Sequence, residues 1–504
     1  MKPLEFVLLA SLMLMNLMLY TQVRVRPRWA HLLPSGSLLL LCLHLLLEGF
    51  RWQLLLAYLM VTFIFLATLR NIRYYRQPWL LWQLDDRKFL RLAGAGLSLL
   101  LLLDTVFLLW VAPLFKMPDP GGTYPIGTTF YYFSDPQREE LFTPDPDDHR
   151  SVSAQAWYPA IVVKGCRQQP YLEAALIISP VIARFLSMPF FAFSHLKHIN
   201  TSACRDSPEA EGRFPVLIFS HAYDGNIAQN TVLMEALASH GYVVFSVGHA
   251  YESPFIYDAD GAPILFDPAN AARQARLGEM SDPEVEQIKA LILSASQTGM
   301  QARYYHRLFA LNPRLQQSVH IWADDIAYFA DQLDAINRRD AILAGRMSLD
   351  AIGVLGHSLG GAAAGQFCVQ DSRCKAGANL DGFQYGDLLE KNLGVPFMFL
   401  YSALPATWNS KVNDCFYQHV ENAAYSLVIG GTAHETFSDM PLYFRADLLR
   451  PELKLIKPQR FASILQAYLL AFFDRHLKGI QAPLLNGPSS EYPEVQFEHH
   501  QPPG

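Results

Sequence analysis

Ser358 is the residue of this chain whose surroundings most strongly indicate chemistry. It stands in Gly356-His357-Ser358-Leu359-Gly360-Gly361, between the apolar segment 351–355 and the small residues 362–365. The first segment is typical of a buried strand and the second of a closely packed helix. A G-x-S-x-G motif on such a turn holds the serine oxygen above a sheet, at a helix N-terminus that favours negative charge. The pattern therefore predicts that Ser358 is a nucleophile.

Two later residues fit the partners that such a serine needs. A serine becomes a good nucleophile when a histidine accepts its proton and an acid orients that histidine. With this motif the acid and then the histidine follow the serine along the chain. Asp381 follows the strand-like segment 375–380, and His434 follows the strand-like segment 425–429. Because active-site residues gather at the carboxyl ends of parallel strands, we expect Ser358, Asp381 and His434 to form a catalytic triad.

Other acids and histidines could occupy the two partner positions. The competing acids are Asp371, Asp387 and Asp439, and the competing histidines are His240, His249 and His419. Asp371 precedes the strand-like segment, and Asp387 lies in an expected helix. Two of the histidines precede the serine, which is the wrong chain order, and no strand leads into His419. These observations favour Asp381 and His434.

Backbone N–H groups are expected to bind the negative charge that develops on the substrate's carbonyl oxygen. One donor is Leu359, the residue after the nucleophile, and the other comes from a loop after an earlier strand. The strand-like segment 214–221 leads into Ala222 and Tyr223. We expect the second donor to be the N–H of Tyr223, with Ala222 as the alternative. No metal-ligand spacing stands out, so neither a metal nor another cofactor is expected.

Several segments resemble the plasma-type platelet-activating factor acetylhydrolases (lipoprotein-associated phospholipase A2) and their bacterial dienelactone-hydrolase-like relatives. They are Trp157-Tyr158-Pro159, Phe219-Ser220-His221, Ala238-Ser239-His240-Gly241-Tyr242, Gly356-His357-Ser358-Leu359-Gly360-Gly361, Asn379-Leu380-Asp381-Gly382 and His434-Glu435-Thr436-Phe437-Ser438-Asp439. The steps from Ser358 to Asp381 and on to His434 also suit this family. Ala222 departs from it, because a glycine is usual after the histidine.

The resemblance covers about residues 125–480 and implies both a fold and an activity. The fold is the α/β-hydrolase fold, with a mostly parallel, doubly wound sheet. The activity is that of a calcium-independent serine esterase acting on short or oxidised acyl chains of phospholipid-like esters. Two alternatives are an acyltransferase that passes the acyl group to an envelope acceptor, and a non-enzymatic membrane sensing module.

The first 116 residues contain apolar runs typical of membrane helices. The runs are Phe6–Tyr20, His31–Glu48, Gln53–Thr68 and Leu92–Val111. A spanning helix needs about 20 apolar residues, and no cleavage-site pattern follows the first run, which favours an anchor over a removed signal. We expect about four spans; the alternative is short helices in the bilayer interface. Asp104, inside the fourth run, is expected to bond within the helix bundle.

Charge placement predicts how these spans are oriented. The loops after the first and third runs carry nine basic residues: Arg24, Arg26, Arg28, Arg70, Arg73, Arg76, Arg87, Lys88 and Arg91. The loop between the second and third runs carries only Arg51. Because basic loops stay cytoplasmic, the N-terminus and the domain after residue 116 are expected outside. For a bacterium this means an inner-membrane protein with a periplasmic catalytic domain.

The remainder of the chain is expected to form one acidic catalytic domain. After residue 116 there are 28 basic and 41 acidic residues, a formal charge of −13, which argues against binding of nucleic acid or of anionic lipid by charge. We expect the domain at 117–480, with insertions near 167–210 and 255–318 that either cover the active site or add a packing layer. Residues 481–504, with His499 and His500, are expected to form a mobile tail.

The cysteines allow two disulfides. Cys166 and Cys204 bracket the first insertion, and Cys368 and Cys374 lie between the expected elbow helix and the next strand. An oxidising compartment would permit both pairs as disulfides. Reduced, buried thiols are the equally weighted alternative.

Overall fold

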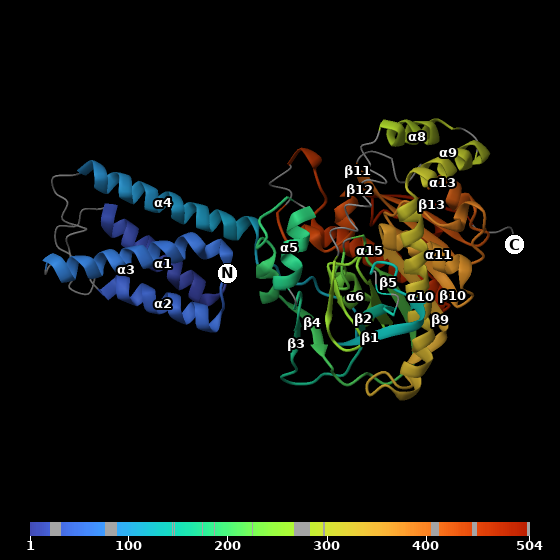
Figure 1. Ribbon diagram of the computed structural model, residues 1–504, viewed down its shortest axis with the longest axis horizontal. Helices are drawn as coiled ribbons and strands as arrows, with labels where there is room; N and C mark the ends of the chain where they lie inside the picture. The colour runs from blue at the N-terminus through green and yellow to red at the C-terminus, as the bar shows by residue number, and fades with distance from the viewer. Residues whose placement is uncertain are drawn as a thin grey trace.

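A computed structural model describes most of the chain. The described residues are 1–20, 32–75, 88–143, 145, 147–173, 175–185, 187–223, 225–266, 283–295, 298–404, 413–445 and 451–500. They form a bundle of helices from the N-terminal part and a larger α/β part that follows it in the chain (Figure 1). The two parts touch at one end of the bundle.

The bundle is made by the four expected apolar runs. Its helices are α1 (Pro3–Tyr20), α2 (Leu33–Leu47), α3 (Leu55–Tyr75) and α4 (Lys88–Val111), and a turn of 3₁₀ helix, η2 (Trp52–Leu54), precedes α3. The segments Trp52–Arg70 and Leu92–Val111 are long and apolar enough to cross a membrane, whereas the apolar stretches of α1 and α2 are shorter. Asp104 does not bond inside the bundle as expected; its side chain is exposed on α4, and Ser98 instead accepts a hydrogen bond from Asn16.

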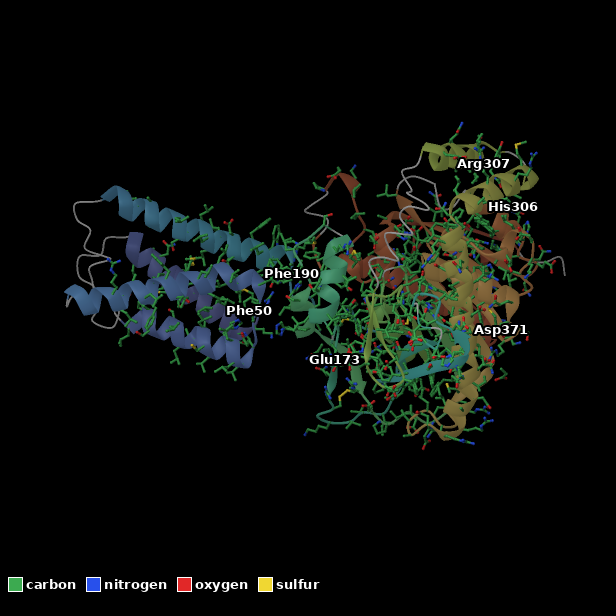
Figure 2. All side chains as sticks on the ribbon, viewed as in Figure 1. Phe50, Glu173, Phe190, His306, Arg307 and Asp371 are labelled. Atoms are coloured by element: carbon green, nitrogen blue, oxygen red, sulfur yellow. A yellow bond between two sulfur atoms is a disulfide. The ribbon has the colours of Figure 1, made fainter. Side chains whose placement is uncertain are left out.

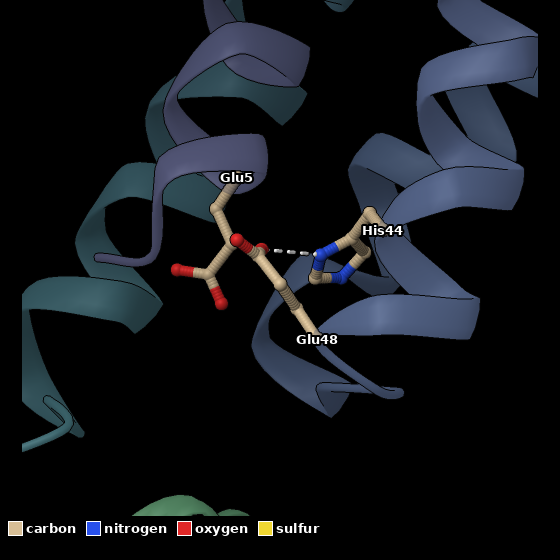
Figure 3. Close-up of side chains that lie close together, drawn as sticks. All are labelled: Glu5, His44 and Glu48. Carbon is tan, nitrogen blue, oxygen red and sulfur yellow. Dashed lines mark hydrogen bonds and ion pairs between the residues drawn. The ribbon is translucent and has the colours of Figure 1, made fainter.

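Buried polar residues join three helices at the end of the bundle that faces the α/β part. Nη1 of Arg51 donates to both carboxylate oxygens of Glu5, at 2.8 and 2.9 Å, and both side chains are almost fully buried. His44 Nδ1 lies 2.9 Å from a carboxylate oxygen of Glu48 (Figure 3). Its Nε2 lies 2.7 Å from the hydroxyl of Tyr58. Glu5, His44 and Glu48 lie close enough to hold a metal. Because both nitrogens of His44 already have partners, we interpret the cluster as a set of hydrogen bonds and ion pairs that joins the helix ends.

This end of the bundle contacts the first insertion of the α/β part. The indole N–H of Trp52 donates to the carbonyl of Ala192 at 3.1 Å, and the N–H of Arg445 donates to the carbonyl of Val111 at 3.0 Å. Figure 2 shows Phe50 of the bundle and Phe190 of the insertion on facing sides of this junction. The catalytic part is therefore held against the helices and not only tethered to them.

A mostly parallel sheet forms the centre of the α/β part, as expected. Its strand order is β13-β12-β11-β10-β9-β5-β6-β2-β1-β4-β3. The strands are β1 (Ile126–Glu139), β2 (His149–Pro159), β3 (Gln168–Pro170), β4 (Asn200–Arg205), β5 (Phe214–Ser220), β6 (Val243–His249), β9 (Met347–His357), β10 (Cys374–Leu380), β11 (Phe397–Leu404), β12 (Ala424–Ala433) and β13 (Val495–His500). All neighbouring pairs from β6 to β12 are parallel, and antiparallel pairs lie outside them at β2 and β13.

Helices cover both faces of this sheet. Along β5, Val216 and Ile218 belong to one apolar core and Leu217 and Phe219 to the other, because successive side chains of a strand point to opposite faces. The first core is closed by α10 (Pro313–Arg339) and α11 (Leu359–Gln370), and the second by α6 (Thr231–Ser239) and α15 (Pro458–Leu477).

In the described residues, both insertions form helices and strands. The first contains β3, α5 (Ala175–Phe185), the 3₁₀ helix η4 (Ser194–His198) and β4. The second contains the hairpin of β7 (Phe255–Tyr257) and β8 (Pro263–Leu265), and the helices α8 (Pro283–Ser294) and α9 (Thr298–Leu311). The second insertion contributes to the main core through Tyr305, whose ring packs on Phe416. It therefore supplies the packing layer that was one of the two alternatives.

The C-terminal segment differs from the expectation. The expected mobile tail is wrong for its described part: β13 pairs antiparallel with β12, and His500 Nε2 lies 3.0 Å from the carbonyl of Val420.

Both cysteine pairs form disulfides in the structure, with Cα–Cα separations of 5.8 Å for the Cys166 pair and 5.1 Å for the Cys368 pair. These separations are ordinary for disulfides.

Candidate active site

Ser358 occupies a sharp turn between β9 and α11. Its backbone has φ 56° and ψ −123°, in the left-handed half of conformational space, where a side chain is strained. Glycines are required on both sides of it: a Cβ on Gly356 would collide with the carbonyl of Gly360, and one on Gly360 would collide with the carbonyl of Ser220. The G-x-S-x-G spacing is thus explained by close backbone approach.

The structure brings Ser358, His434 and Asp381 together in one hydrogen-bonded chain. His434 Nε2 lies 2.9 Å from Ser358 Oγ, and His434 Nδ1 lies 2.8 Å from Asp381 Oδ2. The side chain of Asp381 is fully buried, whereas that of His434 is 41% exposed. A substrate can therefore reach the serine and histidine but not the acid.

The parallel strands bring these three residues to one edge of the sheet. Ser358, Asp381 and His434 directly follow β9, β10 and β12. The N–H of Ser358 donates to the carbonyl of Leu380 at 2.9 Å, which ties the nucleophile to the strand that carries the acid. The N–H of Ser402, in β11, donates to Asp381 Oδ1 at 2.7 Å. This bond orients the Asp381 carboxylate independently of His434.

Electrostatics favour a histidine that is ready to become charged. Burial lowers the pKa of His434, but the hydrogen bond to Asp381 and the negative charges of Asp381 and Glu435 outweigh it, and the net pKa is raised. A raised pKa means that the imidazolium is stabilised. Such a histidine is suited to take the proton of Ser358.

The competing acids have other partners. Asp371 pairs with Arg373, and Asp387, in the short 3₁₀ helix η5 (Asp387–Leu389), pairs with Lys391. Asp439 is buried and accepts hydrogen bonds from the hydroxyl of Tyr171 and from a backbone N–H. Burial raises the pKa of Asp439 to about 8, so this group tends to remain protonated at neutral pH.

The competing histidines are also placed elsewhere. His240 binds the carbonyl of Ala236 at the end of α6. His419 ends the short helix α13 (Asp414–Gln418). His249 belongs to a separate buried network, described below.

The loop after β5 begins beside the turn of Ser358, because the carbonyls of Ser220 and His221 pack against Gly360. The N–H of Ala222 donates to Oε1 of Gln229 at 3.1 Å. The ring of Tyr223 stacks on Trp322, with ring centroids 6.4 Å apart. Leu359 is the first residue of α11, so its N–H has no partner within the helix. The N–H of Ala222, the alternative donor, is therefore already engaged by Gln229.

A second Ser-His-Asp chain lies behind this loop. Ser220 Oγ is 2.9 Å from His249 Nε2, and His249 Nδ1 is 2.8 Å from Asp325 Oδ2. Arg150 holds the same carboxylate with two hydrogen bonds, at 3.0 and 2.8 Å. Ser220, His249 and Asp325 are all fully buried, so no substrate reaches them. The network anchors the end of β5, from which the loop emerges.

The sequence interpretation missed this network, although one signal pointed to it. Asp325 lies on the buried face of α10, with Trp322, Ile326 and Phe329. A charged residue on an apolar helix face requires a partner, because an unpaired buried charge is very costly. The partner, Arg150, comes from β2, 175 residues away in the chain, and no local pattern connects the two.

Comparison with known proteins confirms the resemblance inferred from the motifs. The family model of platelet-activating factor acetylhydrolase, isoform II, matches residues 333–481. A probable 1-alkyl-2-acetylglycerophosphocholine esterase of Arthroderma benhamiae is 23% identical over 421 residues, which are 76% of this chain and 94% of that protein. A platelet-activating factor acetylhydrolase of Bos taurus is 23% identical over 338 residues, which are 64% of this chain and 68% of that protein.

A solved structure supports the fold. A ferulic acid esterase from Streptomyces cinnamoneus superimposes with a TM-score of 0.57 and 22% identity, covering 76% of this chain and 98% of that one. At this identity the likeness concerns the fold alone.

Proposed function

Because this chain is related to the platelet-activating factor acetylhydrolases, we propose that it is a membrane-anchored serine esterase. The observation that carries the proposal is the continuous chain from Ser358 Oγ through the His434 ring to Asp381, with contacts of 2.9 and 2.8 Å. This order of nucleophile, base and orienting acid is the arrangement used for acyl transfer through an acyl-enzyme.

The proposed reaction proceeds in two halves. Ser358 Oγ attacks the ester carbonyl carbon while His434 Nε2 accepts the hydroxyl proton, and the N–H groups of Leu359 and Tyr223 bind the oxyanion. Collapse of the tetrahedral intermediate breaks the bond to the alcohol, which leaves with the proton held by His434. Water then attacks the acyl-enzyme, again through His434, releasing the carboxylic acid and restoring Ser358.

Anchoring is proposed from the bundle, and its contact with the α/β part supports a lipid substrate. Leu176 and Ile177 of α5 and the nearby Phe190 are 68%, 41% and 70% exposed. They belong to the insertion that contacts the end of the helices, so they would face a bilayer that the helices cross. The same insertion reaches the segment after His434 through the hydrogen bond from Tyr171 to Asp439. Phospholipid-like esters with short or oxidised acyl chains are the substrates that we propose.

The two disulfides support an outward-facing catalytic domain. Disulfides persist in oxidising compartments such as the periplasm and are rare in the cytosol. Together with the basic loops expected inside, they favour placement on the extracytoplasmic side. For a bacterium, that side is the periplasm.

The test is hydrolysis by the full chain in detergent. Nitrophenyl esters of increasing acyl length, followed by phospholipids with short or long sn-2 chains, would define the substrate. The variant Ser358→Ala should lose hydrolysis and reaction with a fluorophosphonate probe while keeping the thermal unfolding midpoint, because triad members act as a unit. Activity of this variant within tenfold of wild type would refute the proposal, as would failure of the wild-type chain to react with the probe.

A further inference from the structure

One buried side chain, Gln229, connects the separate segments that build the active site. Its Oε1 accepts the N–H of Ala222, in the oxyanion loop, at 3.1 Å. Its Nε2 lies 2.7 Å from Nδ1 of His357, the residue before the nucleophile. Nε2 of His357 in turn lies 3.2 Å from the backbone carbonyl of His434. The oxyanion loop, the nucleophile turn and the catalytic histidine are therefore linked in series.

The chemistry of these groups fixes the direction of each hydrogen bond. An amide oxygen can only accept and an amide nitrogen can only donate, so the N–H of Ala222 sets the orientation of the Gln229 amide. His357 Nδ1 must then accept, which leaves the ring proton on Nε2 to be donated to the carbonyl of His434. Burial, and then the charge of His434, hold the pKa of His357 well below its ordinary value, so the ring remains neutral, as this pattern requires.

The backbone around Gln229 strengthens the same connection. The carbonyl of Gln229 accepts the N–H of Asp439 at 3.0 Å, and the side chain of Asn230 donates to the carbonyl of Phe437 at 2.7 Å. Both contacts are made with the segment that follows His434. In the oxyanion loop, a Cβ on Gly225 would collide with the amide oxygen of Gln229. The loop is thus shaped around this amide.

We propose that Gln229 is a positioning residue that holds the oxyanion donors and His434 in register about Ser358. It occupies the N–H of Ala222, which is therefore not offered to the oxyanion. This role rests on the proposed serine esterase activity. It acts on the transition state more than on substrate binding, and a displacement of about 1 Å at such a site can cost about 100-fold in rate.

The first test compares two glutamine substitutions by their kcat, KM and unfolding midpoints. Gln229→Met keeps roughly the side-chain volume but removes the hydrogen bonds to Ala222, His357 and Asn230. Gln366→Met is the matched control, because Gln366 is also buried and binds Asp387 and Gln370, away from the Ser358 end of α11. We expect Gln229→Met to lower kcat by about 10- to 100-fold with KM within threefold of wild type. Gln366→Met should keep kcat, with a similar change in unfolding midpoint.

The second test uses the pH dependence of kcat/KM for Gln229→Glu. The carboxylate still accepts the N–H of Ala222 but offers no proton to His357 Nδ1, and instead favours a proton there. His357 then gains a proton in the working pH range, so the profile should show an ionisation that wild type and Gln229→Met lack. A residue with a merely structural role would not alter this profile.

The outcomes separate this inference from the proposed function. A wild-type chain without esterase activity would refute the function and, with it, this role. An active wild type with Gln229→Met within threefold in kcat would refute the role of Gln229 alone. Equal losses in Gln229→Met and Gln366→Met, or a wild-type pH profile for Gln229→Glu, would also refute it.

Discussion

The backbone N–H of Ser402 donates to Oδ1 of Asp381 at 2.7 Å and leaves Oδ2 to bind His434 at 2.8 Å. The two oxygens of one buried carboxylate are therefore assigned to two different partners. Because the Ser402 backbone can only donate, the oxygen next to it must be an acceptor. If the carboxylate is replaced by an amide, the NH₂ group must therefore take the position of Oδ2, next to His434.

This geometry predicts the effect of Asp381→Asn. The amide oxygen will stay with the N–H of Ser402, which turns the NH₂ group toward His434 Nδ1. His434 will then carry its proton on Nε2, where it cannot accept the proton of Ser358. We expect kcat to fall about 10⁴-fold with folding retained, measured on a nitrophenyl ester. Asp387→Asn is the matched control and should stay near wild type; the reverse result would contradict the assignment of the acid.

The raised pKa of His434 predicts the acid limb of the pH–rate profile. His434 must be neutral to accept a proton, so activity is lost as the pH falls through its pKa. The hydrogen bond to Asp381 and the charges of Asp381 and Glu435 outweigh burial and raise this pKa above the ordinary 6.5. We therefore expect the midpoint of the acid limb of kcat/KM above pH 6.5.

Asp381→Asn provides the internal check on that limb. It removes the hydrogen bond to a charged acid and its negative charge but leaves burial in place, so the pKa of His434 should fall. The residual activity of this variant should show its acid limb at lower pH than wild type. A limb that stays in place, or moves to higher pH, would contradict the stated cause.

Much of this site was predictable because it depends on local patterns. The strands that end before Ser358, Asp381 and His434 are short apolar runs, and the glycines of the turn are fixed by close backbone contacts. Parallel strands then bring the three residues to one edge of the sheet without further information. The structure places all three as this reasoning expected.

Other features depend on contacts that no local pattern encodes. The edge strand β13 is short and lies in a proline-containing segment, so pairing with β12 decides its structure more than its own composition. The oxyanion loop is shaped by an amide seven residues downstream, that of Gln229. The buried network of Arg150, His249 and Asp325 joins β2, β6 and α10. In each case tertiary contacts determine the result.

The buried network predicts a large stability effect for Asp325→Ala. This change removes the two-point partner of the Arg150 guanidinium, which is 2% exposed, while Glu140 still pairs with it. Breaking a buried ion pair in this way costs about 3–5 kcal/mol. The control is Asp331→Ala, because Asp331 lies on the same helix as Asp325 but pairs with Arg373 at the surface, where its side chain is 61% exposed. Such pairs contribute only about 0–1 kcal/mol. Equal unfolding midpoints for the two variants in detergent would contradict this view.

The orientation of the bundle gives the last prediction. The polar cluster of Glu5, His44 and Arg51 marks one end of the bundle, and this end contacts the α/β part. The helices therefore alternate in direction, with α1 and α3 starting and α2 and α4 ending on the catalytic side. We predict that the opposite end of the bundle is cytoplasmic, because the sequence carries basic residues between α1 and α2 and around the connection between α3 and α4.

Reporter fusions measure this orientation directly. Alkaline phosphatase fused after Gly504 should be active, and a fluorescent protein that folds only in the cytoplasm should be dark there. Fusions after Gln77, between α3 and α4, should give the opposite pattern and serve as the control. A fluorescent C-terminal fusion would mean an odd number of spans, most simply if the segment 31–68 crosses once or lies in the interface. It would also place the Cys166–Cys204 and Cys368–Cys374 pairs in a reducing compartment, where disulfides are rare.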